Sequence, residues 1–399
     1  MPPLSDPAHR AALQAQAAAL IAFFRPSLNA QGGFDLLDYD GQPIPDAPQE
    51  LHTTTRLVHS YALAQAYGAK DCAPIIEAGM AALMTRHRDT QYGGFVWSFG
   101  PNGVVDGTKL AYGHVFVLLA ASSARQAGHD GAPALLAEID TLITQHYWDE
   151  GLGRLCDEYT RDWQPFSTYR GMNANMHGAE AFLAAFETAG EAKYLHRAGR
   201  ILDFFTAQMA PQQGWRIPEH YTAAWQIDPD YEGNPMFRPA GTTPGHALEF
   251  ARLLLQHWDL AGRRDETAIP RARALVATAL ADGWLADGAI AYTVAPSGQM
   301  LRPARYWWPM TEALGALAAL MKADPTPQDA LWYDRVWQAA NARFIDHARG
   351  GWYPEINADG APALGQFKGK PDIYHALQAM LFPLAPGLSR PFDDLRKGV

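Results

Sequence analysis

Short segments that join glycine to an aromatic residue recur along this chain at intervals of about 60 residues. They begin at Gly32, Gly93, Gly151, Gly214, Asp287 and Gly350, so successive starts differ by 61, 58, 63, 73 and 63 residues. Each segment is typical of a tight turn followed by a short extended stretch. This sixfold repeat constrains the fold more strongly than the length of 399 residues, which by itself favours two or three domains.

Pairs of helical patterns lie between these segments. We predict twelve helices, over residues 7–25, 51–68, 72–88, 108–127, 131–147, 173–189, 192–209, 243–261, 266–281, 306–322, 327–346 and 371–384. The even-numbered helices are apolar on nearly every side, as at Leu110–Ala121, whereas the odd-numbered helices are apolar on one side only. A helix that is apolar all round is buried, and a one-sided helix lies at the surface.

The alternation therefore predicts an all-α fold, an (α/α)6 barrel of six inner and six outer helices with short β-hairpins at one end. We expect residues 1–399 to form a single barrel domain. A linear helical solenoid is the competing architecture, although common solenoid repeats are shorter, at roughly 34–47 residues.

Charge and composition exclude several classes of partner. The 32 basic and 42 acidic side chains give a net charge of −10, which argues against nucleic acid and against anionic membrane surfaces. The N-terminal residues MPPLSDPAHR lack the pattern of a signal peptide, and no apolar run reaches the roughly 18 residues of a membrane span. Two cysteines, Cys72 and Cys156, make no disulfide framework. We expect a cytoplasmic protein with no nucleic-acid or membrane partner.

Each predicted inner helix carries a polar or aromatic residue near its start. These residues are Arg56, Tyr112, His177, His246, Trp308 and His375, at spacings of 56, 65, 69, 62 and 67. In a closed ring they converge on one cavity at the axis. An unpaired buried polar group costs roughly 1–3 kcal/mol, so a ring of them favours a wet cavity over a set of satisfied core side chains.

Histidine dominates this predicted site, and its ordinary pKa suits proton transfer near neutrality. The pairs His177–Glu180 and His246–Glu249 are spaced i, i+3, so each carboxylate can orient the imidazole on the same helix face. A local hydrogen bond without catalytic meaning and a metal site are the alternatives. Because cysteine ligands and an H-E-x-x-H motif are absent, we predict no metal.

The tryptophans, together with the absence of several known motifs, indicate which class of ligand the chain binds. The chain has 12 tryptophans, and six are candidates to stack on sugar faces: Trp97, Trp215, Trp225, Trp307, Trp308 and Trp352. No G-x-G-x-x-G, phosphate loop or G-x-S-x-G elbow is found, so we predict no cofactor and no serine hydrolysis. A neutral polyol is the favoured substrate.

Five ordered motifs resemble the N-acylglucosamine 2-epimerase superfamily. They are TTRLVHSYALA (54–64), KLAYGHVFVLLAASSA (109–124), NANMHGAEAFLAAFE (173–187), PGHALEFARLLL (244–255) and GKPDIYHALQAMLFP (369–383). The chain looks closest to the bacterial aldose–ketose isomerase branch, whose members act on D-mannose or sulfoquinovose. The resemblance implies an (α/α)6 barrel and interconversion of D-mannose and D-fructose without a cofactor or metal, through a cis-enediolate.

The resemblance also implies roles for individual residues. His246 and His375 correspond to the paired acid/base histidines, and His177 to a third histidine of the pocket. The residues implied to hold sugar oxygens or orient a histidine are Arg56, Tyr112, Asn173, Arg238, Glu249, Trp308 and Glu312. In the mechanism we expect, His375 takes the C2 proton and His246 moves a proton between oxygens or returns one to carbon.

Other functions remain open at this point. A sugar 2-epimerase or a sulfoquinovose isomerase would use the same enediolate chemistry. A toroidal glycoside hydrolase would need two carboxylates, for which Glu219, Glu249 and Glu312 are candidates. A non-catalytic sugar-binding protein is the remaining alternative. For each enzyme the expected partner is a small saccharide, and the chain is expected to be a monomer or homodimer.

Overall fold

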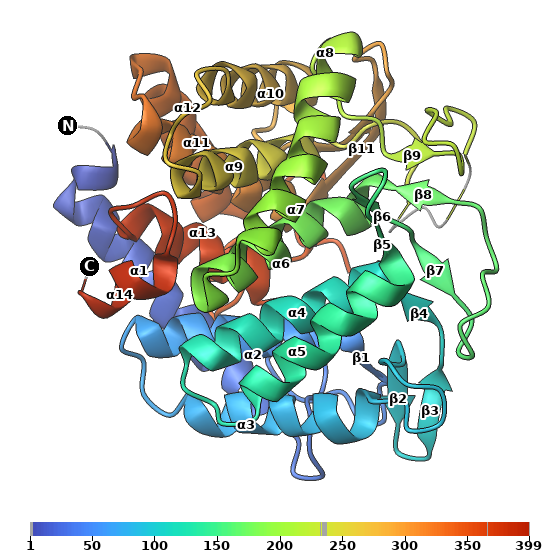
Figure 1. Ribbon diagram of the computed structural model, residues 1–399. Coiled ribbons are helices and arrows are strands. Elements are labelled where there is room, and N and C mark those ends of the chain that lie inside the picture. Colours follow the sequence, from blue (N-terminus) through green and yellow to red (C-terminus); the bar gives the residue numbers. More distant parts are fainter. Residues whose placement is uncertain (1–2, 232, 234–237, 365, 399) are drawn as a thin grey trace.

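The computed structural model describes residues 3–231, 233, 238–364 and 366–398. Figure 1 shows both chain ends on one side of the molecule, whereas strands β2–β9 gather on the opposite side. None of the helices in the described part of the chain is long and apolar enough to cross a membrane.

Six inner helices form a closed ring, which confirms the predicted (α/α)6 barrel. They are α2 (Leu51–Ala66), α4 (Ala111–Gln126), α6 (Met172–Ala189), α9 (Pro244–Leu260), α11 (Trp307–Ala323) and α13 (Tyr374–Leu384). Each packs on the next along the chain, and α13 also packs on α2. That last contact closes the ring and rules out a linear solenoid.

Six outer helices cover this ring, each packed on an inner partner. They are α1 (Pro7–Phe24), α3 (Ala73–Ala82), α5 (Ala132–Leu142), α7 (Ala192–Leu202), α10 (Ala268–Gly283) and α12 (Pro327–Arg343). The predicted helices 72–88, 131–147 and 192–209 exist, but their last turns widen into π-helix at Leu83–His87, Ile143–Tyr147 and Asp203–Met209. The short helices α8 (Ala210–Gln212) and α14 (Pro391–Arg396) were not predicted.

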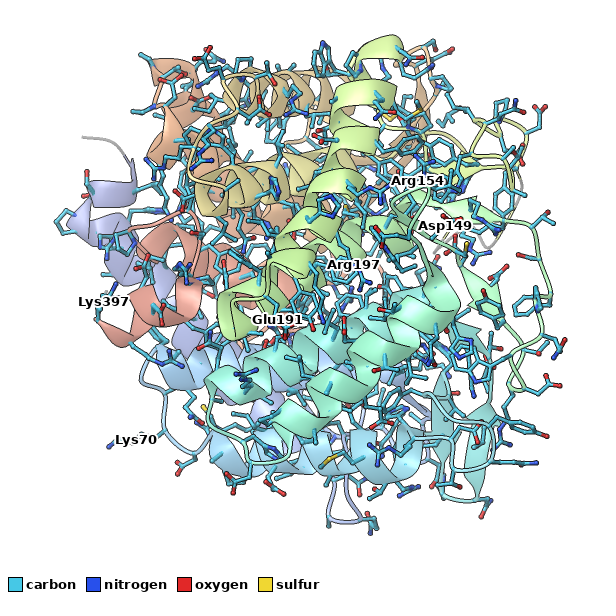
Figure 2. All side chains as sticks on the ribbon, in the orientation of Figure 1. Lys70, Asp149, Arg154, Glu191, Arg197 and Lys397 are labelled. Carbon is cyan, nitrogen blue, oxygen red and sulfur yellow. The ribbon has the colours of Figure 1, made fainter. Side chains whose placement is uncertain are left out.

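Local sequence explains where several helices begin. The Asp6 carboxylate accepts hydrogen bonds from the backbone N–H groups of Ala8 and His9 at the start of α1. Thr326 and Asp329 form a capping box at the start of α12. The inner helices are apolar on nearly every side, as predicted, and residues 113–124 of α4 are all buried. Charged side chains such as Lys70 and Lys397 lie at the edge of the molecule (Figure 2).

The strands are short and antiparallel. Two three-stranded sheets comprise β1 (Gln49–Glu50), β2 (Ser98–Gly100) and β3 (Gly103–Asp106), and β10 (Ala291–Val294), β11 (Met300–Tyr306) and β12 (Glu355–Ile356). Three pairs comprise β4 (Lys109–Leu110) with β7 (Glu158–Tyr159), β5 (Trp148–Asp149) with β6 (Arg154–Leu155), and β8 (Arg170–Gly171) with β9 (His220–Tyr221). Strands β1, β4, β8 and β11 run directly into α2, α4, α6 and α11, so strand pairing fixes where these inner helices begin.

Most of the repeated glycine–aromatic segments form a turn. The residues before and after the turn pair with each other in a short antiparallel bridge. Bridges join Leu28 to Phe34, Arg88 to Phe95, Trp284 to Ile290 and Ile345 to Trp352, and β5–β6 enclose Gly151. The paired glycines at these turns, such as Gly93 with φ 74° and Gly94 with φ 68°, adopt a left-handed conformation that side chains disfavour. At the Gly214 segment, the described residues 214–219 contain no strand or bridge.

Candidate active site

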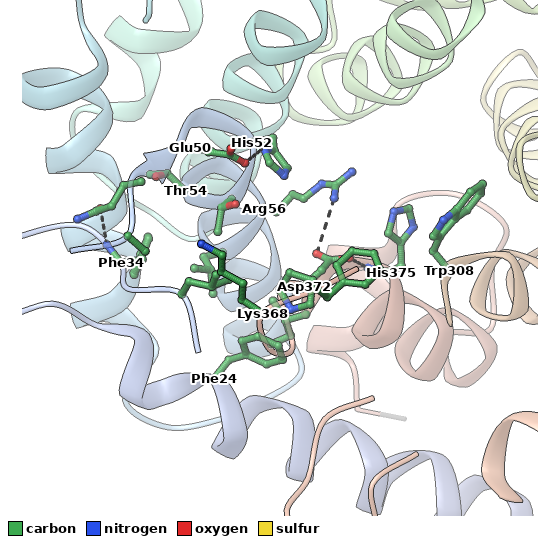
Figure 3. Close-up of a pocket in the computed structure, with 18 of the residues that line it drawn as sticks. Phe24, Phe34, Glu50, His52, Thr54, Arg56, Trp308, Lys368, Asp372 and His375 are labelled. Atoms are coloured by element: carbon green, nitrogen blue, oxygen red, sulfur yellow. Dashed lines mark hydrogen bonds and ion pairs between the residues drawn. The ribbon is translucent and has the colours of Figure 1, made fainter. Parts of the chain in front are cut away.

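A cavity of about 510 Å³ opens at the end of the barrel where the inner helices begin. Every inner helix contributes a residue from its first two turns to the wall. Eight of the ten predicted site residues line it: Arg56, Tyr112, Asn173, His177, His246, Glu249, Trp308 and His375. Figure 3 shows Arg56 between His375 and Trp308 on one side and Phe34 on the other, so the cavity extends beyond the histidines.

His246 lies in the first turn of α9, between a carboxylate and an indole. Its Nδ1 atom is 3.0 Å from both carboxylate oxygens of Glu219, the residue directly before β9. The Trp308 ring lies against one face, with centroids 5.0 Å apart and a tilt of 30°. An ionised carboxylate only accepts hydrogen bonds. Nδ1 therefore carries the proton, and Nε2 is left as an acceptor for a ligand in the cavity.

His375 repeats this arrangement from the first turn of α13. Its Nδ1 atom lies 2.8 Å from Oε1 of Glu312 on α11, and its ring centroid is 6.1 Å from that of Trp308. Asp372 accepts a hydrogen bond from the backbone N–H of Tyr374 at 2.9 Å and so holds the start of the helix. Both His246 and His375 thus lie beside the same indole, each with its Nε2 atom available.

His177 is buried more deeply and has weaker partners. Its Nδ1 atom is 3.5 Å from Oε2 of Glu180 and 3.6 Å from Oε1 of Glu249. The Tyr112 ring meets it edge-on, with centroids 5.3 Å apart. Burial lowers the pKa of His177 to about 4, although Glu180 opposes the shift. The imidazole is therefore neutral near pH 7.

Three carboxylates surround Arg252 beneath the histidines. Its Nη2 atom is 3.6 Å from both Glu180 and Glu249, and its Nε atom is 3.3 Å from Glu312. Glu180 also accepts a hydrogen bond from the Tyr374 hydroxyl, whereas neither oxygen of Glu249 has a hydrogen-bond partner. Burial, followed by the charges of Glu312 and Glu180, raises the pKa of Glu249 well above its ordinary value. Of the three carboxyl groups, Glu249 is therefore the one whose protonated form its surroundings favour, because the pKa values of Glu180 and Glu312 are lowered instead.

The same cluster contains two sets of side chains whose ligand atoms lie close enough together to hold a metal ion. One set is His177, Glu180 and Glu249, and the other is Glu249, Glu312 and His375. The Arg252 guanidinium contacts all three carboxylates and already supplies the positive charge that a metal would bring. We therefore retain the prediction that the site works without a metal.

Arg56 places a fixed positive charge in the cavity wall. Its Nη2 atom donates to the Tyr112 hydroxyl at 3.0 Å, and its Nη1 atom lies 3.9 Å from Oδ1 of Asp372. The guanidinium carbon lies over two neighbouring rings, 4.6 Å from the centroid of Phe116 and 4.8 Å from that of Tyr374. These contacts fix the orientation of a donor that can face a developing oxyanion.

Three residues predicted to bind the substrate lie in different places relative to the cavity. Asn173 lines the cavity, and its Oδ1 atom is buried without a hydrogen-bond partner. Glu312 lies behind His375 and is not among the described residues that line the cavity. Arg238 is also outside that lining set, because its guanidinium pairs with Glu158 at 2.5 Å and lies 3.9 Å from the Tyr169 ring centroid.

The i, i+3 spacing predicts the contact between His177 and Glu180 correctly, but it predicts the wrong partner for His246. The His246 imidazole contacts Glu219, whereas Glu249 approaches His177 instead. The i, i+3 spacing puts two residues on one helix face, but it does not decide which neighbouring element supplies the closer group. Of the six tryptophans proposed as sugar platforms, only Trp307 and Trp308 are among the described residues that line the cavity.

Sequence reasoning missed two groups in the site. Arg252 was not singled out, because an arginine on an apolar inner helix gives no sign of which carboxylates it will meet. Glu219 was considered only as a carboxylate of a glycoside hydrolase, since 27 residues separate it from His246.

Comparison with known proteins identifies the family. The model of the N-acylglucosamine 2-epimerase (GlcNAc 2-epimerase) family matches residues 32–379. The chain belongs to this family. It is 38% identical over 394 residues to a D-mannose isomerase of Thermobifida fusca, covering 96% of each chain. It is 34% identical over 360 residues to a D-mannose isomerase of Marinomonas mediterranea, covering 88% of this chain and 90% of the relative.

A crystal structure of D-mannose isomerase has the same architecture. It superimposes with a TM-score of 0.89 at 31% identity, covering 95% of this chain and 99% of that chain. As a member of the N-acylglucosamine 2-epimerase family with isomerase relatives along its length, the protein is an enzyme of the isomerase or epimerase type.

Proposed function

We propose that this enzyme interconverts the monosaccharides D-mannose and D-fructose, using histidines as acid and base. The observation that carries the proposal is the pair His246 and His375, which face one cavity with each Nδ1 atom held by a carboxylate. The identity of 38% to a D-mannose isomerase over nearly the whole chain supports the choice of substrate. We also retain as part of this proposal that residues 1–399 act as one catalytic domain.

In the reaction we propose, one hydrogen moves from C2 to C1 and another moves from O2 to O1. The Nε2 atom of His375 takes the C2 proton of the open-chain aldose, and the C–H electron pair forms the C1=C2 double bond of a cis-enediolate. His246 takes the O2 proton and delivers a proton to O1. The proton held by His375 then returns to C1, which gives the ketose. Each histidine ends in its starting protonation state.

The negative charge of the enediolate needs stabilisation where it develops. Arg56 supplies a fixed guanidinium, and the cavity lies at the N-terminal ends of the inner helices, where the helix dipoles favour negative charge. One positioned acid or base contributes about 10²–10⁴-fold and one oxyanion donor about 10²–10³-fold. Both contributions are needed, because neither alone overcomes the low acidity of a C–H bond.

The remaining wall groups suit a neutral sugar. The Tyr112 hydroxyl and the side-chain amide of Asn173 belong to cavity-lining residues, and these polar groups suit sugar hydroxyl groups. The raised pKa of Glu249 limits the negative charge that this buried carboxyl group adds near the enediolate. The indole of Trp308 borders the same space.

The test is incubation of the purified enzyme with D-mannose, D-fructose, D-glucose and N-acetylmannosamine, separately, in deuterated water, followed by NMR. We expect mannose and fructose to interconvert, with deuterium appearing only at C1 of fructose and C2 of mannose. A heat-denatured sample controls for slow base-catalysed exchange.

Other outcomes would replace the proposal. Conversion of N-acetylmannosamine or of mannose to its C2 epimer, without fructose, would assign a 2-epimerase. Turnover of sulfoquinovose with no reaction on mannose would assign the other isomerase of the predicted branch. Release of reducing sugar from oligosaccharides would assign a hydrolase, and binding without exchange at C2 would assign a non-catalytic protein.

A further inference from the structure

Glu219 contacts both helices that carry neighbouring histidines, although it lies on neither. Its backbone carbonyl accepts a hydrogen bond from the N–H of Met172 at 2.9 Å, at the start of α6. Its carboxylate accepts one from the N–H of Thr243 at 3.0 Å, at the start of α9, and lies 3.0 Å from Nδ1 of His246. The residue is 4% exposed and is not part of the described cavity wall. It therefore acts on a ligand only through His246.

The surroundings of Glu219 differ from those of the equivalent carboxylate behind His375. Glu312 shares its charge between His375 and Arg252, at 2.8 and 3.3 Å. Around Glu219, by contrast, no Lys or Arg nitrogen of the described residues lies within 4 Å, and His246 is its ion-pair partner. The charge of Glu219 is thus directed at one imidazole and one backbone N–H group.

This contact decides which nitrogen of His246 carries the proton. An ionised carboxylate can only accept, so Nδ1 must donate and Nε2 must be free. The indole of Trp308 covers one ring face and leaves little room for the ring to turn over. An imidazole held at one edge and one face presents its Nε2 atom in one direction.

We propose that Glu219 is the positioning residue for His246, fixing its tautomer and ring orientation so that Nε2 meets the sugar. This role rests on the proposed isomerase function, because it assigns His246 a proton-transfer step. Loss of an equivalent carboxylate behind a catalytic histidine elsewhere leaves the wrong tautomer and lowers kcat by about 10⁴-fold.

Kinetics of Glu219→Gln and Glu219→Asp give the first test. The amide of Gln can donate to Nδ1 and stabilise the wrong tautomer, so we expect kcat for mannose to fall about 10²–10⁴-fold while KM changes little. Asp keeps an acceptor-only carboxylate and should retain more of kcat than Gln. Asp282→Asn is the matched control, because Asp282 pairs with Arg216 away from the cavity. It should leave kcat unchanged.

The second test reads the tautomer directly, in the free enzyme and without substrate. ¹⁵N NMR of histidine-labelled protein distinguishes a protonated Nδ1 from a protonated Nε2, and His246→Asn assigns the signal. We expect a protonated Nδ1 in the wild type and a shift toward protonated Nε2 in Glu219→Gln. A wild-type His246 protonated at Nε2 overturns the proposal even if every variant fails to fold.

The two proposals fail in different ways. If the wild type does not isomerise mannose but His246 is protonated at Nδ1, the proposed function is wrong and the action of Glu219 on His246 stands. If the wild type isomerises mannose and Glu219→Gln keeps its kcat, or Asp is no better than Gln, the role of Glu219 is wrong. Loss of stability with unchanged kcat would leave Glu219 only its structural contact with Thr243, and would also overturn the proposal.

Discussion

Gly245 lies so close to the indole of Trp308 that a Cβ atom at this position would come within 2.3 Å of Cζ3. The glycine is in the first turn of α9, next to His246. Its missing side chain is what allows the Trp308 indole to lie beside both acid/base histidines, with its centroid 5.0 Å from that of His246 and 6.1 Å from that of His375. The packing around those imidazoles therefore depends on a residue that has no side chain of its own.

Gly245→Ala should consequently damage the site as well as the packing. Overpacking of this kind typically costs about 1–3 kcal/mol of the unfolding free energy, and displacement of Trp308 should lower kcat at the same time. Urea unfolding and mannose turnover measure the two effects. The double variant Gly245→Ala with Trp308→Phe should recover stability relative to Gly245→Ala, because a smaller ring makes room. If the changes in unfolding free energy of the two single substitutions simply add in the double variant, the close contact between Gly245 and Trp308 is contradicted.

His375→Asn should abolish turnover and leave the fold intact. The Asn amide can still donate to Glu312, so the buried carboxylate keeps a partner, but no base faces C2. We expect a loss of at least about 10²–10⁴-fold in kcat, with an unchanged circular dichroism spectrum. His114→Asn is the control, since His114 also begins an inner helix but bonds Leu110 and Tyr147 instead of facing the cavity. Near-normal activity of His375→Asn would refute the assignment.

Arg56→Lys should show that the planar guanidinium matters, not only its charge. A lysine has no planar guanidinium to stack on Phe116 and Tyr374, and it cannot present a fixed fork of donors. We expect kcat/KM for mannose to fall about 10²–10³-fold. Arg86→Lys is a matched control, because Arg86 stacks on Phe99 at 4.4 Å outside the cavity wall. Equal effects of the two substitutions would show that only packing is lost.

Asp157 should make stability depend on pH. Burial raises the pKa of this carboxyl from 3.8 to about 7, against the opposing charge of Arg238. A raised pKa means that folding favours the protonated form. The stabilisation that this carboxyl group adds to the free energy of unfolding is therefore complete below pH 3.8 and is lost as the pH rises to about 7. Asp157→Asn keeps an acceptor for the Gly171 N–H group. The free energy of unfolding of this variant should therefore fall less steeply with rising pH than that of the wild type. Urea unfolding between pH 4 and pH 7 measures it, and parallel curves for wild type and variant would contradict it.

The twelve barrel helices and their inner or outer placement could be predicted because they follow from local patterns. Apolar residues on every side of 108–127 and on one side of 327–346 report burial directly. Their alternation with glycine turns every 60 residues or so then leaves few ways to close the chain. The widening of helix ends into π-helix, as at Leu83–His87, could not be predicted from these patterns.

The sequence also indicated which end of the barrel carries the cavity, since polar residues near the start of each inner helix must lie at the same level. It could not choose partners across the ring. The pairing of His246 with Glu219, the meeting of three carboxylates at Arg252, and the placement of Arg238 against Glu158 all join residues from different repeats. Periodicity is a property of one segment and is written in the sequence. Hydrogen-bond partners are set by distances between segments, and those distances exist only in the folded barrel.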